Sequence, residues 1–196
     1  KDLDRAMEVL TLMKKDGVTA NTKTFNSLIN AAGAAQRLDA AFEIYEAMKR
    51  AEVKPDSYTH NVLISASVQC RASDRAFGVL REMESQGFQP DACSYNTLIK
   101  VCGQQKDLPR ALELYETMVS RGIRPTRITY NGLLTVCNIV GNVPEAMRIL
   151  QELRTTHRPD QVSFNIVLEL LSRDHEDEDA FIEVFGESQR RFCRIR

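Results

Sequence analysis

The sequence predicts an all-α protein, an α-solenoid built from stacked helix-turn-helix repeats. The main observation is a three-residue phrase that returns at almost constant spacing and consists of a hydroxyl residue, an aromatic residue or histidine, and an asparagine. Two amphipathic stripes in each period and a proline near the end of most periods support it. The first four asparagines are 35 residues apart and the fifth follows after 34: Asn26, Asn61, Asn96, Asn131 and Asn165. Tandem periods of about 20 to 50 residues are typical of solenoids.

Each period opens with a helix whose apolar residues lie two and three places after the asparagine, which indicates an inward-facing surface. These residues are Leu28 and Ile29, Leu63 and Ile64, Leu98 and Ile99, Leu133 and Leu134, and Val167 and Leu168. Six places after the asparagine, Cys102 and Cys137 occupy a position that holds Ala32, Ser67 or Leu171 in the other repeats. We expect both cysteines to be buried packing residues, because a free cysteine behaves as a small hydrophobe.

A second helix follows in each period. It is marked by an alanine fifteen places after the asparagine and by apolar residues three, four and seven places after that alanine, the offsets of one amphipathic stripe. The alanine predicts a close approach of two helices. The sets are Ala41, Ile44, Tyr45 and Met48; Ala76, Val79, Leu80 and Met83; Ala111, Leu114, Tyr115 and Met118; and Ala146, Ile149, Leu150 and Leu153.

Turn residues divide the chain into units. Pro109 and Pro144 suit the first turn of a helix, and glycines such as Gly87 and Gly122, followed by a proline, end the repeats. We expect helices of about 11 to 14 residues, close to the average length. The predicted units are 1–21, the second helix and closing loop of a truncated repeat; 22–56, 57–91, 92–126 and 127–160, four full repeats; and 161–196, a degenerate last repeat in which Glu183 and Glu187 replace apolar stripe residues.

The composition excludes several classes of protein. With 26 basic and 27 acidic residues among 196, the chain has no global positive field, so any polyanion must be bound by local groups. No stretch approaches the 18 or so apolar residues of a membrane span. The five cysteines contain no CxxC pair and are odd in number, which argues against a disulfide framework or a zinc site. The sequence opens inside a predicted helix, so we expect a fragment whose targeting segment lies outside it.

These features together resemble pentatricopeptide repeats. The resemblance rests on the 35-residue helical hairpin, the Thr-Tyr-Asn-x-Leu-Ile opening, alanine at offset fifteen, methionine at offset twenty-two and the Gly-x-x-Pro-Asp close, and it covers nearly the whole chain. The tetratricopeptide repeat differs in its 34-residue period and its tryptophan-containing first helix, and this chain has no tryptophan. The resemblance implies a right-handed superhelix that binds single-stranded RNA in an organelle, one base per repeat.

In that family, the residue at the asparagine position and the last residue of the same repeat select the base. A carboxamide offers one acceptor and two donors to the Watson–Crick edge of a pyrimidine. Asparagine with aspartate resembles the uridine combination, and asparagine with threonine favours cytidine over uridine. The implied pairs are Asn26 with Asp56, Asn61 with Asp91, Asn96 with Thr126, and Asn131 with Asp160, while Asn165 has no recognisable closing partner. The implied target is 5′-U-U-(C or U)-U-3′, with the N-terminus at the 5′ end.

The family also has a small aliphatic residue three places before the asparagine, which sandwiches the base. The corresponding residues are Lys23, Tyr58, Cys93, Ile128 and Val162. Only Ile128 and Val162 conform, although Tyr58 can stack on a base and Lys23 can pair with a phosphate. Eight places after the asparagine, where the family often has a lysine facing the backbone, lie Ala34, Gln69, Gln104, Ile139 and Arg173. The groove is therefore expected to be nearly neutral.

No cluster of residues predicts an enzyme, a cofactor or a metal site. His60, His157 and His175 lie in different repeats without ligands at a suitable spacing, and we expect them at the surface or at interfaces. We expect no membrane partner and no small-molecule substrate. Three alternatives stay open: the asparagines only link adjacent helices; the solenoid is a scaffold in an organellar assembly such as a ribosome or RNA polymerase; or a catalytic domain lies outside this sequence. The implied compartment is an organelle, with the chloroplast favoured over the mitochondrion.

Two charged segments stand near the C-terminus. The acidic run 174–179 is expected in the turn between the two helices of the last repeat, where it is solvated, repels RNA or meets a basic partner. The tail 190–196 is basic and contains an aromatic residue, and it is suited to contact RNA or an acidic protein.

Overall fold

The structure, a computed structural model, describes residues 2–173 and 178–192 and contains only helices in that part of the chain. The chain forms two compact units, Lys1–Leu98 and Ile99–Arg196. The helices are α1 (Asp2–Lys15), α2 (Thr22–Ala34), α3 (Leu38–Arg50), α4 (Ser57–Gln69), α5 (Ser73–Ser85), α6 (Ala92–Gln105), α7 (Leu108–Ser120), α8 (Arg127–Val140), α9 (Val143–Thr156), α10 (Gln161–Leu171) and α11 (Glu178–Phe192). The predicted all-α class and the alternation of two short helices are confirmed.

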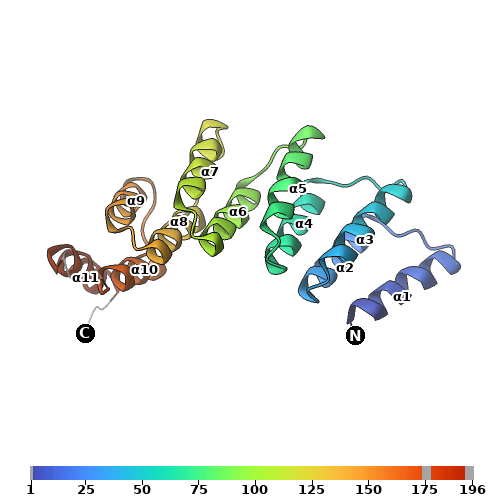
Figure 1. Ribbon diagram of the computed structural model, residues 1–196, viewed down its shortest axis with the longest axis horizontal. Coiled ribbons are helices and arrows are strands. Elements are labelled where there is room, and N and C mark those ends of the chain that lie inside the picture. Colours follow the sequence, from blue (N-terminus) through green and yellow to red (C-terminus); the bar gives the residue numbers. More distant parts are fainter. Residues whose placement is uncertain (1, 174–177, 193–196) are drawn as a thin grey trace. The chain divides into compact units, whose positions relative to one another are not determined.

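In the first unit, the opening helices of successive repeats pack on one another. Helix α2 contacts α4, and each packs against the second helix of its own hairpin, α3 and α5 respectively (Figure 1). Helix α1, which precedes the first hairpin, packs against α2. The backbones come very close at Gly33, where a Cβ atom would lie 2.7 Å from Cβ and 2.8 Å from Cα of Ala66.

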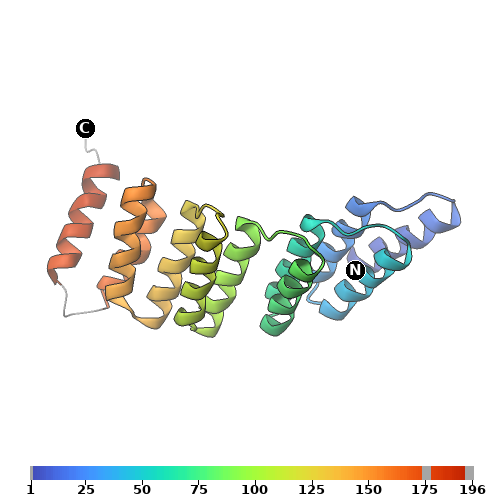
Figure 2. The same ribbon diagram turned by 90° about the horizontal axis from the view of Figure 1, so that it is seen from above.

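The second unit repeats this arrangement. Helix α8 contacts α7, α9 and α10, and α10 contacts α9 and α11. Figure 2 shows these helices side by side in chain order. Helices α6 and α8 also approach closely, since a Cβ atom on Gly132 would lie 3.3 Å from Ile99. Each unit is thus a stack of hairpins, and the repeat boundaries within it stay a prediction.

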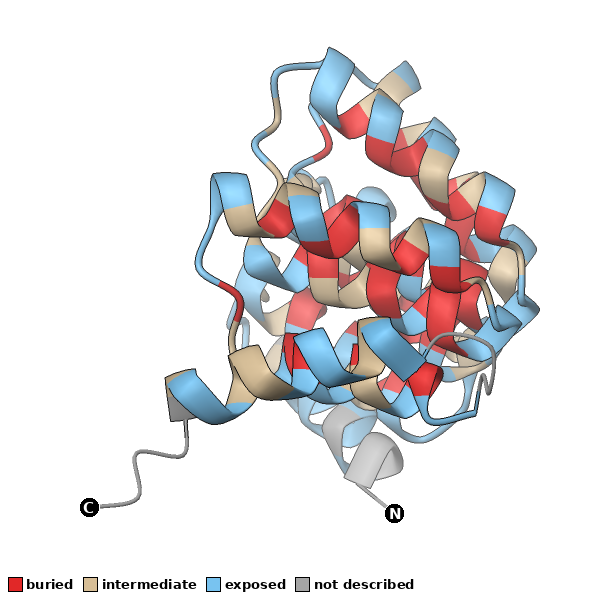
Figure 3. Ribbon diagram, turned by 90° about the vertical axis from the view of Figure 1, so that its left-hand side faces the viewer, coloured by how far each residue is buried: buried red, intermediate tan, exposed pale blue. Residues whose placement is uncertain are grey.

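The predicted apolar stripes form the core. The helices in the foreground of Figure 3 carry their buried residues along one side. The four alanines at offset fifteen are fully buried, as their role at a close helix contact requires: Ala41, Ala76, Ala111 and Ala146. Cys102 and Cys137 are also buried, and burial raises the pKa of their thiols to about 11 and about 12. The expectation that both are inert packing residues is confirmed.

A partly buried polar network joins consecutive second helices. The Oη of Tyr45 donates a 3.0 Å hydrogen bond to Oε1 of Glu82 and lies 3.4 Å from Nε2 of His60. His60 is fully buried at this interface, and its Nδ1 lies 2.9 Å from the carbonyl oxygen of Asp56. Seventy residues further on, the network recurs with Tyr115, Tyr130 and Glu152. Burial raises the pKa of Tyr45 and Tyr115, so both hydroxyls stay protonated and can donate.

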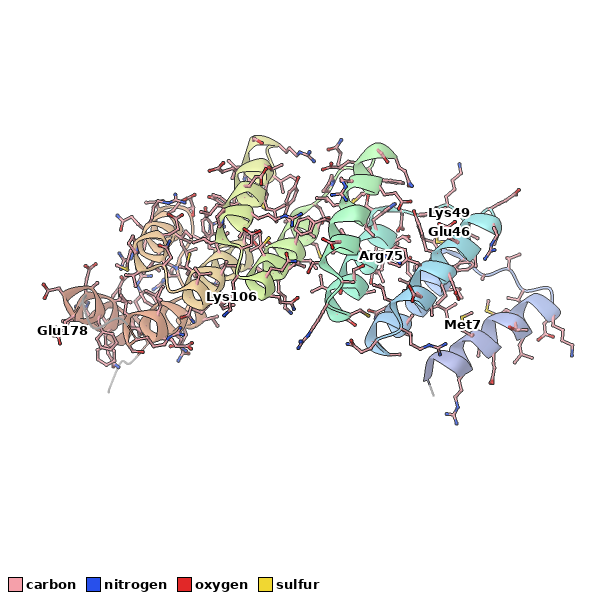
Figure 4. All side chains as sticks on the ribbon, in the orientation of Figure 1. Met7, Glu46, Lys49, Arg75, Lys106 and Glu178 are labelled. Carbon is pink, nitrogen blue, oxygen red and sulfur yellow. The ribbon has the colours of Figure 1, made fainter. Side chains whose placement is uncertain are left out.

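Exposed faces of the helices carry ion pairs between neighbouring turns. Glu46 and Lys49 lie next to each other on α3 (Figure 4), with 2.6 Å between Oε1 and Nζ. Such exposed pairs contribute little to stability because water and salt screen them. None of the described helices is long and apolar enough to cross a membrane.

Several helices are followed by a residue in the left-handed backbone conformation. At some of these positions the residue is glycine, and at others it has a side chain. Gly17, Gly87, Gly122 and Gly141 have φ between +70° and +81°. Four residues with side chains adopt the same conformation at the other ends: Gln36, Glu52, Arg71 and Lys106. At α3, for example, the amide of Val53 donates to the carbonyl of Met48 and that of Glu52 to Lys49, so the last carbonyls are satisfied in a Schellman arrangement.

The degenerate last repeat is held partly by charge. Glu187 pairs with Arg154 of α9 and, at 2.7 Å, with Arg191, while Glu183 lies 3.6 Å from Arg154. The two glutamates that interrupt the predicted stripe therefore bind α11 to α9 through an arginine. Residues 174–177 of the acidic run, including His175, and residues 193–196 of the tail, including Cys193, lie outside the described residues.

Gly33→Ala is expected to lower the free energy of unfolding by about 1 to 3 kcal/mol, because the new methyl group overlaps the backbone of α4. Urea unfolding followed by circular dichroism measures the change. Gly78→Ala is the matched control, because a Cβ atom there meets nothing within 4 Å. That substitution should raise stability by about 0.5 to 1 kcal/mol through helix propensity. Equal effects of the two substitutions would contradict the close approach.

Candidate nucleic-acid interface

The predicted base-binding pairs lie where the second helix of one repeat gives way to the first helix of the next. At this junction the last residue of the repeat caps the following helix. Oδ1 of Asp91 accepts a hydrogen bond from the amide of Ser94 at 3.0 Å, and the amide of Asp91 donates in return to the hydroxyl oxygen of Ser94 at 3.2 Å. Asp56, Asp160 and Thr126 form the same capping box at α4, α10 and α8. The sequence thus places the closing residue at a helix start for a structural reason.

Asn61 and Asp91 are in direct contact. Nδ2 of Asn61 donates to both carboxylate oxygens of Asp91, at 3.2 Å and 3.3 Å. The other end of the amide, Oδ1, accepts from the hydroxyl of Ser94 at 2.5 Å. Because this contact is shorter than the one to Asp91, the single hydroxyl proton of Ser94 points to Asn61. The three side chains therefore form one polar group that spans two repeats.

The second unit contains an equivalent group. Nδ2 of Asn131 donates to Oδ1 of Asp160 at 3.4 Å, and the hydroxyl of Ser163 donates to Oδ1 of Asn131 at 2.6 Å. Burial by itself would raise the pKa of Asp160, but hydrogen bonds from the backbone amide of Ser163 and from Asn131, together with the charge of Arg127, lower it below its ordinary value. The carboxylate is therefore ionised throughout the neutral range.

In the first pair, Asn26 with Asp56, the asparagine is less exposed to solvent than Asn61 or Asn131. Asn26 is only 5% exposed, and its buried Oδ1 has no hydrogen-bond partner within the described part of the chain. The hydroxyl of Thr59 lies 2.8 Å from Asp56 and does not reach Asn26. Burial raises the pKa of Asp56, but hydrogen bonds from Thr59 and Asn26 outweigh it and lower the value overall. The structure thus brings this pair together without the third contact seen at Asn61.

The remaining asparagines differ from these. Asn96 belongs to the first unit and Thr126 to the second. The Oδ1 of Asn96 is buried and, among the described residues, unpaired. Asn165 is exposed on α10. Unlike the three aspartate pairs, the amides of Asn96 and Asn165 have no hydrogen bond to a carboxylate within residues 2–173 and 178–192.

The predicted base-sandwiching residues are all exposed at the start of the first helix of each repeat: Lys23, Tyr58, Cys93, Ile128 and Val162. The exposed fractions of Tyr58, Ile128 and Val162 are 64%, 70% and 54%. Large apolar side chains with this exposure, beside a polar pair, can stack on a base. The residues eight places after the asparagines are exposed as well, so the neutral groove expected from Ala34, Gln69, Gln104 and Ile139 faces water.

Sequence reasoning missed the role of the hydroxyl residue two places before each asparagine. Ser94 and Ser163 each connect a capping aspartate to the asparagine of the preceding repeat. The signal was present, since every repeat has serine or threonine at this position. It was used only as part of the repeated phrase.

The described residues contain no group of three or more histidine, cysteine, aspartate or glutamate side chains that could hold a metal ion. His60 is an interface residue, as expected, and His157 is exposed at the end of α9.

Residues 1–169 match the family model of the pentacotripeptide-repeat region of PRORP. The chain belongs to the pentatricopeptide repeat family. A comparison with curated proteins finds no match. The family model establishes the family of this chain, and solved structures show the same fold.

Several solved structures have this fold. The crystal structure of the pentatricopeptide repeat protein PPR10 from maize is 29% identical and superposes with a TM-score of 0.74, covering 97% of this chain. PPR10 in complex with an 18-nt psaJ RNA element is 25% identical, also with a TM-score of 0.74, over 94% of this chain. The PPR domain of Arabidopsis thaliana PRORP1 in complex with tRNA is 20% identical with a TM-score of 0.69, covering 87% of this chain and 91% of that domain, and shows the fold. The chain spans 27% of the length of PPR10, or 29% in the RNA complex.

Asn131→Ala is expected to raise the pKa of Asp160, because one of the hydrogen bonds that favour its ionised form is removed. A depressed pKa stabilises the fold above the pKa of the unfolded chain, about 3.9, and this contribution is lost as the pH falls through the folded value. The variant should therefore be less stable than the wild type at pH 7, and the difference should shrink near pH 3. Carboxyl NMR titration and urea unfolding at both pH values measure this.

Asn165→Ala is the matched control for that comparison, since Asn165 is exposed and lacks a carboxylate partner within the described residues. It should leave the titration of Asp160 unchanged. An unaltered pKa of Asp160 in the Asn131 variant would show that the 3.4 Å contact is absent in solution.

Proposed function

We propose that this repeat array binds single-stranded RNA, with one base at each repeat junction. The observation that carries the proposal is the pairing of an asparagine amide with the closing aspartate, directly beside an exposed side chain that can stack on a base. Asn61 with Asp91, flanked by Tyr58, is the most complete example. The RNA-bound structure of PPR10, which has the same fold, supports an RNA ligand.

The hydrogen bonds within the junction explain how a base would be selected. In the free protein, Asn61 uses its Oδ1 for Ser94 and directs Nδ2 to Asp91. One lone pair on Oδ1 and one N–H hydrogen are left for a base. A uracil edge offers an N–H donor between two carbonyl acceptors and can satisfy both. The neighbouring contacts hold the amide in one orientation, so the donor and acceptor are already positioned.

The finer assignments extend this proposal. The pairs Asn26/Asp56, Asn61/Asp91 and Asn131/Asp160 select uridine, and Asn96/Thr126 selects cytidine or uridine, which gives 5′-U-U-(C or U)-U-3′. The same proposal places the last residues of the four full repeats at positions 56, 91, 126 and 160. We infer an organellar role in RNA stabilisation, processing or translation, with the chloroplast favoured over the mitochondrion, from the family resemblance.

A protein scaffold is the second candidate, and one observation favours it. The amides at Asn61 and Asn131 already bond to aspartates of the same chain, so they link repeats without any ligand. A net charge of −1 also gives no general attraction for RNA. In this case the array would hold a protein surface within an organellar assembly.

Binding of labelled RNAs that carry UUCU, UUUU or GAGA in one neutral context should show a pyrimidine preference, measured by fluorescence anisotropy at two salt concentrations. The double variant Asn61→Ala, Asn131→Ala should lose most of that preference. Each substitution should cost about 1 kcal/mol, roughly fivefold in affinity for the pyrimidine targets.

Gln189→Ala removes an exposed amide from α11, away from the repeat junctions, and should bind like the wild type. Circular dichroism checks that each variant is folded. If the folded wild type binds none of the RNAs even at low salt, the scaffold candidate replaces RNA binding.

A further inference from the structure

The segment that closes the fourth repeat differs from the other closing segments. Helices α3, α5 and α7 are followed by a residue in the left-handed conformation, at Glu52, Gly87 and Gly122. Helix α9 runs to Thr156 and is capped by His157 in an extended conformation, with φ −140° and ψ 168°. The fourth repeat has one residue fewer than the three before it. Its closing segment has no described residue in the left-handed conformation, so the residue that is missing corresponds to Glu52, Gly87 and Gly122 of the other repeats. The shorter connection leads directly from the helix into Arg158 and Pro159.

This connection and α11 line a pocket of about 470 Å³ that is rich in hydrogen-bond donors. Its polar lining consists of Arg154, Thr155, Thr156, His157, Arg158 and Arg191. Among the residues that the structure describes, no aspartate or glutamate lines it. The pocket lies wholly within the second unit.

The three arginines are only partly neutralised. Glu187 pairs with both Arg154 and Arg191, and Glu183, which is 64% exposed, adds a weaker contact to Arg154. Arg158 is exposed and has no ion pair in the described part of the chain. The Nε of Arg154 is buried without a hydrogen-bond partner there. The pocket therefore holds an excess of positive charge.

The C-terminus of α9 disfavours the binding of an anion, because a helix C-terminus carries partial negative charge. Two features of the sequence reduce this opposition. The hydroxyls of Thr155 and Thr156 donate to the carbonyl oxygen of Glu152 at 2.8 Å and 2.9 Å. Arg154 contributes a positive charge in the last turn. Arg158 is then the exposed cation of the pocket that has no ion pair in the described part of the chain.

We propose that this pocket binds a phosphate of the RNA strand, the one on the 3′ side of the nucleotide bound by Asn131 and Asp160. The proposal rests on the proposed RNA-binding function. Arg158 lies two residues before Asp160, so their Cα atoms are within about 7 Å of each other. A guanidinium presents two parallel donors that match phosphate oxygens. The pocket thus supplies, at one junction, the charge that the neutral groove lacks.

The test replaces one phosphate at a time by a neutral methylphosphonate in an RNA that contains UUCU and three flanking nucleotides on each side. For the wild type, the replacement directly 3′ of the fourth target base should weaken binding about three- to tenfold. Arg158→Ala should weaken binding to the unmodified RNA by a similar factor and should reduce the slope of log affinity against log salt by about 0.7. In that variant the same methylphosphonate should have little further effect.

Two control variants sharpen the comparison. Arg190→Ala makes the same change in net charge next to Arg191, but Arg190 does not line the pocket, so the sensitivity to that methylphosphonate should persist. Arg158→Lys keeps the charge without the paired donors and should recover the salt slope but only part of the affinity.

The proposal is overturned if the wild type is insensitive to the neutral linkage at that position, or if Arg158→Ala and Arg190→Ala behave alike. Base preference is measured in the same titrations. A pyrimidine preference that survives in both arginine variants, together with insensitivity to the linkage, rejects the phosphate pocket and leaves base recognition intact. Failure of the wild type to prefer pyrimidines would instead reject the proposed function.

Discussion

No helical hairpin in this chain can bury its own apolar face, so each depends on contact with the next. That contact is tight: Ala41, Ala76, Ala111 and Ala146 are fully buried, and at Gly33 there is no room for a Cβ atom. Stacking at this distance also determines where the polar groups meet. The start of each opening helix lies against the opening helix of the previous repeat, so a capping aspartate reaches an asparagine 29 or 30 residues before it.

The closing aspartate consequently has two roles. It caps the helix that follows, and it holds the amide that is proposed to contact the base. These roles are compatible because the carboxylate of Asp91 can accept several hydrogen bonds: Oδ1 accepts from the backbone amide of Ser94, and both oxygens accept from Nδ2 of Asn61. A base that binds here meets an amide already fixed by two protein contacts, and ordering it costs little conformational entropy. The same contacts make the junction self-sufficient without RNA, which is why the scaffold alternative has a structural basis.

The fold could be predicted from the sequence because its determinants are periodic and local. The alanines, the apolar stripes and the prolines recur at fixed offsets, and each has one physical explanation. The left-handed backbone conformation of Gln36, Glu52, Arg71 and Lys106 could not be predicted, since the connections between helices impose it against residue preference. The burial of Asn26 depends on packing around α2, and the bond from Ser94 to Asn61 depends on the distance between repeats. Neither of these properties is visible within a single repeat.

The closing segments of the repeats also carry exposed positive charge. The positions that face water along the opening helices are mostly uncharged, as at Ala34, Gln69 and Gln104. Exposed cations stand instead directly before the closing prolines, at Lys54, Arg124 and Arg158. Because these residues precede the closing residue by only two positions, any phosphate neutralisation occurs beside the proposed base contacts. An array with a net charge near zero can then attract a polyanion at its junctions, while the faces between them stay neutral.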